Sequence, residues 1–99
     1  MHTVIRRYEG VADVAEVTRR AVDEFAPLIS DRPGFQGYWV IDAGQGVIAT
    51  ITVFDTEDAA MDSTAAAAGW IRENLAHRIP NAPQVTAGAT HGVRPGVTV

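Results

Sequence analysis

The 99-residue sequence contains no cysteine. This absence excludes disulfide bonds, thiolate catalysis and any zinc or iron–sulfur centre with cysteine ligands, and it is compatible with a reducing cytoplasm. Basic residues are also few: the sequence has eight of them and twelve acidic residues, which gives a net charge of −4. That balance provides no electrostatic footprint for a phosphate backbone or an anionic membrane surface. Nucleic acid is therefore not an expected partner.

Long apolar runs, glycine-rich phosphate loops and metal-binding motifs are missing as well. No stretch approaches the roughly 20 apolar residues of a membrane span, and the N-terminus lacks the apolar core of a signal peptide, so we expect a cytoplasmic protein with no membrane partner. Gly44-Gln45-Gly46 has the pattern of a hairpin turn and not of a phosphate loop. His2, His77 and His91 are scattered without ligand spacing, which predicts no metal site.

Hydrophobic content of 46% with 20% charged residues is ordinary for a globular protein, and the length suits one domain. We expect this domain to span residues 1–92, followed by a tail at 93–99 that is loose or exchanged at a sheet edge. The pattern predicts strands and helices in the order β-α-β-β-α-β. The predicted strands are at 2–8, 35–42, 47–55 and 84–91. The first helix starts at Asp13 and ends or kinks near Phe25 or Ala26, before Pro27. The second helix spans 57–78, with a potential break near 62–64.

The central hairpin is apolar on both faces. A regular pleat places Phe35, Trp39 and Ile41 on one face and Tyr38 and Val40 on the other. The next strand is also two-sided, with Val47, Ile51 and Val53 opposed to Ile48 and Phe54. A ferredoxin-like βαββαβ fold puts both helices on one face of a four-stranded antiparallel sheet, so the other face would be bare. The sequence therefore predicts an α+β protein that forms a homodimer through this sheet face.

Three sequence features together resemble the dimeric α+β barrel superfamily, in particular its antibiotic-biosynthesis-monooxygenase-like branch. They are the step Pro33-Gly34-Phe35-x-Gly37-Tyr38 into the second strand, the exit Val53-Phe54-Asp55-Thr56 from the third, and Trp70 in the last helix. The similarity covers roughly residues 2–91. It implies a ligand pocket between the helices and the sheet of each protomer, and a cofactor-independent oxygenase acting on an electron-rich aromatic or polyketide-like molecule.

Candidate site residues follow from that implied pocket. One side of the last helix would carry Ser63, Ala66, Ala67, Trp70, Asn74 and His77 at three- and four-residue spacing. We take Trp70, His77 and Tyr38 as candidate catalytic residues, and Trp39, Phe54, Ser63, Ala67 and Asn74 as candidate substrate contacts. Since Tyr38 and Trp39 are successive on a strand, only one of them can face the pocket. The alternative is that Ala67, Ile71 and Leu75 form a core seam, with Trp70 beside it and Asn74 and His77 in solvent.

Two classes of function remain open from the sequence. One is a small cofactor-free enzyme, most plausibly a monooxygenase or a related cyclase or isomerase; the other is a non-catalytic accessory or ligand-binding dimer. The ionisable candidates Arg6, Arg7, His77 and His91 are dispersed along the chain, which favours the second class, whereas the family resemblance favours the first. A haem-degrading relative would need an asparagine on the first strand, and none is present. We therefore expect no cofactor and a small apolar or aromatic ligand.

Overall fold

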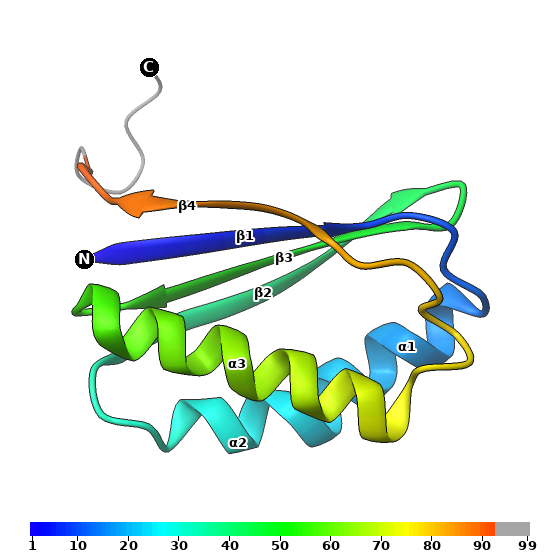
Figure 1. Cartoon of the computed structure of the whole chain (residues 1–99), viewed down its shortest axis with the longest axis horizontal. Helices are drawn as coiled ribbons and strands as arrows, with labels where there is room; N and C mark the ends of the chain where they lie inside the picture. The colour runs from blue at the N-terminus through cyan, green and yellow to red at the C-terminus, as the bar shows by residue number, and fades with distance from the viewer. Residues whose placement is uncertain (93–99) are drawn as a thin grey trace.

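The computed structural model describes residues 1–92 and contains four strands and two helical segments (Figure 1). The predicted tail at 93–99 lies outside the described residues. Within the described part, no helix combines the length and apolarity needed to cross a membrane. The elements are β1 (His2–Tyr8), a first helical segment made of α1 (Val14–Arg20), the π-helical turn η1 (Ala21–Phe25) and α2 (Ala26–Ser30), then β2 (Phe35–Gly44), β3 (Val47–Phe54), α3 (Glu57–Asn74) and β4 (Gln84–Ala89).

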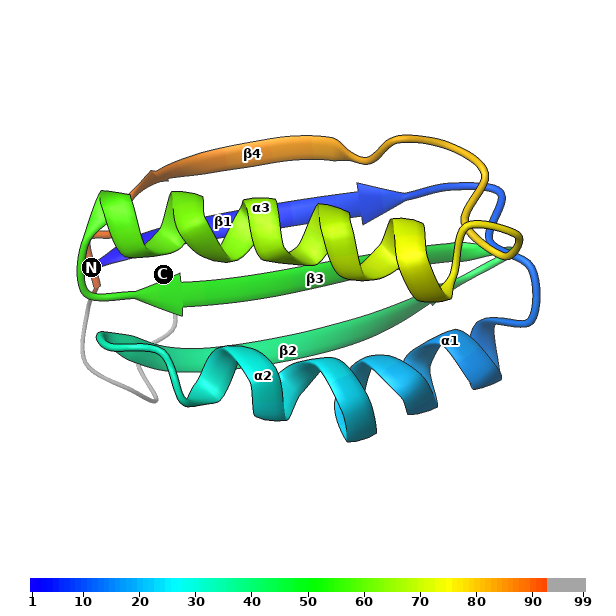
Figure 2. The same cartoon turned by 60° about the horizontal axis from the view of Figure 1, so that its bottom comes forward.

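The strands form one antiparallel sheet in the order β2-β3-β1-β4, which confirms the predicted ferredoxin-like α+β fold. Figure 2 shows both helical segments on one side of the sheet, with α3 over β1 and β3, and α1 to α2 along β2. Edge strand β4 has no helix above it, and all six of its residues are exposed. Of the residues described, none forms a second layer on the opposite face, so that face is bare in the single chain.

The first helical segment continues through Pro27, where the sequence predicted an end or a kink. The segment begins at the predicted residue, where Asp13 accepts the Glu16 backbone N–H at 3.4 Å. In a full capping box the Glu16 carboxylate would in return accept the Asp13 backbone N–H, but here it binds Arg19 instead. Proline clashes with the carbonyl four residues earlier in a regular α-helix. The wider turn at Ala21–Phe25, closed by the Ala26 N–H on the Ala21 carbonyl, relieves that clash, so the segment runs on to Ser30.

The last helix is unbroken but shorter than predicted. Thr56 caps it by accepting the Ala59 N–H at 3.2 Å. The expected break near 62–64 does not occur, because the Ser63 and Thr64 hydroxyls bond back to the Ala60 carbonyl at 2.7 and 3.1 Å and need no partner outside the helix. The helix ends at Asn74 instead of Arg78, with a turn between them. Strand β4 likewise ends two residues before the predicted boundary.

The pleat of the sheet follows the predicted faces except at Phe35. Val4, Arg6 and Tyr8 on β1 are buried under the helices, and β3 alternates along its whole length. A bulge between Phe35 and Gly37 puts Phe35 on the helix side, with its ring 5.6 Å from that of Phe54, instead of on the bare face. A bulge inserts one extra residue, which inverts the alternation on one side of it.

Two buried clusters fill the space between the helices and the sheet. Trp70 is half-buried and packs against both of them, so it stands where the two halves of the core meet. One cluster comprises Val4, Phe25, Ile29, Phe54, Ala60 and Ala67, and the other comprises Tyr8, Val11, Val17, Ile48, Leu75 and Ile79.

Candidate functional site

A cavity of about 30 Å³ lies between the helices and the sheet. Side chains of Phe25, Tyr38 and Trp70 line it, together with Arg6 and Thr50 from the sheet. The ring centroids of Phe25 and Tyr38 are 5.6 Å apart in an edge-to-face arrangement, and those of Phe25 and Trp70 are 5.3 Å apart. Phe25 is the last residue of the π-helical turn, so the local widening of the helix positions the Phe25 ring between those of Tyr38 and Trp70. The result is an aromatic wall.

A larger cavity of about 350 Å³ adjoins the first and is bounded by α3, by β1 and β4, and by the turn before β4. Both cavities are lined by Arg6, Tyr8, Ile71 and Ile79, so they meet at these residues. The small cavity alone holds little more than water. An aromatic molecule would therefore occupy the larger space and reach toward the aromatic wall.

Arg6 is the one charged side chain in the buried set of the described residues, and it is only 3% exposed. Its Nη2 donates to Thr52 Oγ1 at 3.3 Å. Its Nε and Nη1 have no hydrogen-bond partner among residues 1–92, and neither does the buried Thr50 Oγ1. Thr50 is directly opposite Arg6 in the β1–β3 register and lines the same cavity. Unused donors and a hydroxyl thus gather at one point of an otherwise apolar wall.

Burial raises the pKa of Tyr38 to about 12, an effect that the nearby Arg6 charge only partly opposes. Burial also raises the pKa of Tyr8, and the nearby Arg6 guanidinium acts in the opposite direction. Both phenols are therefore protonated at neutral pH. Tyr38 can donate a hydrogen bond to a ligand oxygen, but it is not a base under those conditions.

The structure brings three of the eight candidate site residues to the small cavity: Tyr38, Ala67 and Trp70. Ile71 and Leu75 of the alternative core seam line the same cavity, so the seam and the cavity wall are one surface. Arg6 is the residue that sequence reasoning counted only among dispersed charges. The signal was present, because a regular pleat over the predicted strand at 2–8 puts Arg6 on the same face as Val4 and Tyr8.

Trp39, Phe54 and Ser63 lie away from the cavities. Trp39 is 54% exposed on the bare face, where its ring lies over Gly37 so closely that a Cβ at position 37 would require the ring to move. This resolves the choice between the two adjacent aromatic residues in favour of Tyr38. Phe54 is fully buried in the core, and the buried Ser63 hydroxyl donates to the Ala60 carbonyl.

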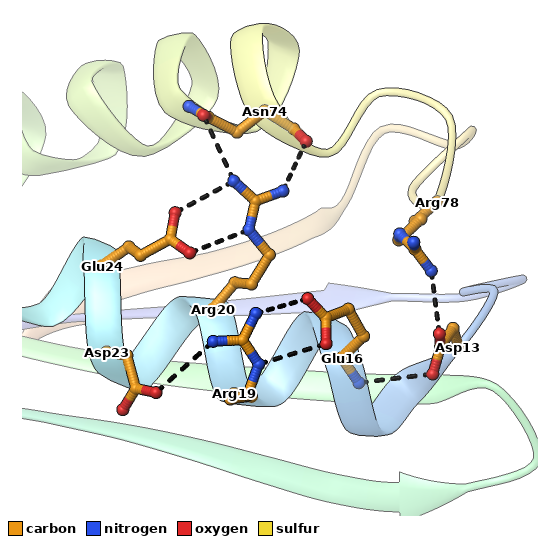
Figure 3. Close-up of polar contacts among 8 residues, drawn as sticks. All are labelled: Asp13, Glu16, Arg19, Arg20, Asp23, Glu24, Asn74 and Arg78. Carbon is orange, nitrogen blue, oxygen red and sulfur yellow. Dashed lines mark hydrogen bonds and ion pairs between the residues drawn. The ribbon is translucent and has the colours of Figure 1, made fainter.

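Asn74 and His77 also lie outside the cavities. Figure 3 shows Asn74 at the end of α3, where the Arg20 guanidinium donates to its backbone oxygen at 3.0 Å and to Oδ1 at 3.4 Å. The Asn74 amide nitrogen donates to the Trp70 carbonyl at 2.9 Å, so this side chain fixes the helix end beside the aromatic wall. His77 is exposed and lines neither cavity.

The described residues contain no group of three or more histidine or acidic side chains placed to hold a metal ion. No protein-family model and no curated protein sequence matches the chain.

Solved structures, in contrast, match the fold over almost the whole chain. A monooxygenase from the gene ActVA-Orf6 of Streptomyces coelicolor, in complex with the ligand nanaomycin D, aligns at a TM-score of 0.74 and 15% identity over 97% of this chain and 92% of that one. SnoaB, a cofactor-independent oxygenase from Streptomyces nogalater, aligns at 0.70 and 14% identity over 95% and 96% of the two chains. NE2512, a protein of unknown function from Nitrosomonas europaea, aligns at 0.72 and 16% identity over 98% and 95%. The chain therefore has the fold of antibiotic-biosynthesis-monooxygenase-like proteins.

Proposed function

We propose that the protein binds a small aromatic molecule between its helices and its sheet and oxidises it with dioxygen, without a cofactor. The observation that carries this proposal is the wall of Phe25, Tyr38 and Trp70 beside a cavity large enough for fused rings. Binding sites for such ligands are mainly apolar, with a few polar groups that fix the orientation. The fold shared with a cofactor-independent oxygenase and with a monooxygenase that binds nanaomycin D supports the oxidation step.

The reaction that suits such a site is the conversion of a ring methylene to a ketone. The methylene carbon of a hydroxyanthracenone loses two hydrogens and gains one oxygen atom from dioxygen, while the other oxygen atom leaves as water. The substrate supplies the electrons, so no external reductant is needed. The ring system would lie in the larger cavity against Ile71, which lines both cavities, with its reacting edge directed toward Trp70 and Tyr38. The neutral Tyr38 hydroxyl would donate to the substrate oxygen, where negative charge develops.

Oxygen uptake with a dihydroxyanthracenone tests the activity. The protein should accelerate formation of the anthraquinone over the rate in buffer, with one dioxygen consumed per product. Trp70→Phe should lower kcat/KM at least tenfold, which is about 1.4 kcal/mol of transition-state stabilisation. Trp39→Phe is the matched control, because this tryptophan lies on the opposite face of the sheet. A rate equal to that in buffer would contradict the oxidation step.

A non-catalytic ligand-binding role is the second candidate, and one observation favours it. Of the residues described, no histidine or carboxylate lines either cavity, so these walls supply no general base of those types. Tight binding of the dihydroxyanthracenone without faster oxidation would select this role.

The proposal includes a homodimer formed through the bare face of the sheet. Trp39 on β2, Ile51 on β3 and Ile5 on β1 form one apolar row across that face in the strand register. Trp39 is 54% exposed and Ile5 is 38% exposed in the single chain. A face shared by two copies about a twofold axis would cover the row.

A further inference from the structure

We infer that the ligand is an aromatic acid and that its ionised carboxylate binds Arg6. This inference rests on the proposed ligand cavity and adds the chemical class of the ligand. It begins with the guanidinium of Arg6, which is 97% buried and directed at the point where the two cavities meet.

The unused donors of Arg6 indicate an anionic partner. A buried charge is costly unless it is paired, and a buried polar group without a partner forfeits its hydrogen bonds to water. Within the described chain Nη2 donates to Thr52 Oγ1, and the buried Nε and Nη1 have no hydrogen-bond partner. A planar guanidinium fork matches the two oxygens of a carboxylate better than it matches a single neutral acceptor.

The charges around the cavities point the same way. Although the chain has a net charge of −4, the larger cavity is lined by Arg6 and Arg72, and no described acidic residue lines either cavity. Two arginines and no carboxylate in the described walls favour negative charge in this space. An acidic molecule approaching this protein would thus find its favourable site here.

Thr50 supplies a second polar contact for the same group. It is directly opposite Arg6 in the strand register, and its buried Oγ1 has no partner in residues 1–92. A hydroxyl donor beside the guanidinium suits a carboxylate, which has about four acceptor positions to satisfy. The aromatic body of the ligand would lie against Ile71 and Trp70, which line the adjoining wall.

Calorimetric titration with naphthoate and with naphthamide tests the inference, because the two probes share shape and differ in charge. The wild-type protein should bind naphthoate about 10- to 100-fold more tightly than naphthamide, which is the usual range for a charged hydrogen-bonded contact. Arg6→Met should abolish the preference, so that naphthoate binds no more tightly than naphthamide. Arg7→Met is the matched control, since Arg7 is on the opposite face of the same strand and pairs with Glu9; it should keep the full preference.

The outcomes separate the inference from the function on which it rests. Equal binding of the two probes by the wild type, or a preference that survives Arg6→Met, would overturn the role of Arg6 and leave the aromatic cavity intact. Failure of both probes to bind would overturn the cavity itself. The wild-type comparison requires no variant, so it remains decisive even if Arg6→Met does not fold.

Discussion

Arg6 illustrates a conflict between stability and binding at the scale of one residue. A guanidinium that is 3% exposed and retains unpaired donors lowers the stability of the ligand-free protein. A buried charge without a partner breaks the rule that buried polar groups are paired, and such exceptions are expected at functional sites. The opposite side of β1 offers the contrast, because Arg7 is exposed and paired with Glu9 at 3.2 Å.

Arg6→Met should therefore stabilise the ligand-free protein. The change replaces a buried charge by an apolar chain of similar length, and we expect a gain of about 1 kcal/mol after the loss of the Thr52 contact. For a domain of this size, the thermal midpoint would rise by about 4–8 °C. Arg7→Met should change stability by less than about 0.5 kcal/mol. A midpoint lowered by several degrees in Arg6→Met would instead identify Arg6 as a structural residue.

The two tyrosines give a second prediction at this scale. Burial raises the pKa of Tyr38 to about 12 and also raises that of Tyr8, and the chain contains no other tyrosine. An unfolded chain releases these protons near pH 10. The stability gained from the neutral phenols is thus complete below about pH 10 and declines as the pH rises from there toward 12. Tyrosinate absorbance of the folded protein should show both midpoints above that of the unfolded chain, and a midpoint near pH 10 for Tyr38 would contradict the burial described.

Residue placement was predictable where the pleat is regular and unpredictable where it is not. The alternation in β1 correctly assigned Val4, Arg6 and Tyr8 to one face. It could not show that Arg6 meets Thr50 and Thr52, because those contacts join strands more than 40 residues apart in sequence. Phe35 was assigned to the wrong face because a bulge depends on pairing with β3, which local sequence does not encode.

At the scale of elements, the π-helical turn shows how tertiary packing overrides a local rule. Pro27 predicted a helix end or a kink near Phe25 or Ala26, since its ring disfavours regular α-helix. The observed turn keeps the helix going and places Phe25 against both Tyr38 and Trp70. Those ring contacts come from β2 and α3, so the sequence around Pro27 alone could not reveal them. Strand and helix order, in contrast, followed directly from hydrophobic periodicity.

The contact between the two helices at Arg20 carries the third prediction. Arg20 bonds Glu24 on its own helix and also reaches two oxygens of Asn74 at the end of α3, whereas Arg19 pairs only with acids of its own helix (Figure 3). Arg20 is also the more buried of the two. Arg20→Gln should lower the free energy of unfolding by about 1–2 kcal/mol, because α3 loses a cationic cap at its C-terminus.

Arg19→Gln is the matched control for that change, and we expect it to cost less than about 0.5 kcal/mol, as for an exposed ion pair. Urea denaturation of both variants measures the difference. Equal losses would show that the intrahelical pairs, and not the contact to Asn74, supply the stability.

At the scale of the whole molecule, the sheet has one covered and one bare face. The sequence indicated this from a hairpin apolar on both sides, and the fold explains it, since both helical segments lie on the same side. Trp39 belongs to the bare face because its neighbour Tyr38 belongs to the cavity. The proposed assembly and the proposed ligand binding would therefore use opposite sides of the same strand, and each can be tested by a change on its own side.

Ile41→Glu should therefore break the proposed homodimer while leaving the fold and the cavity intact. Ile41 is 43% exposed on the bare face, so a carboxylate is tolerated in the single chain but would be buried against its symmetry mate in the dimer. Light scattering at micromolar concentration should give twice the chain mass for the wild type and a single chain mass for the variant. Val22→Glu, at a 51% exposed position on the first helical segment, should keep the doubled mass. A wild-type mass equal to one chain would overturn the dimer. It would show that the protein is stable in water with the apolar row of Ile5, Trp39 and Ile51 uncovered.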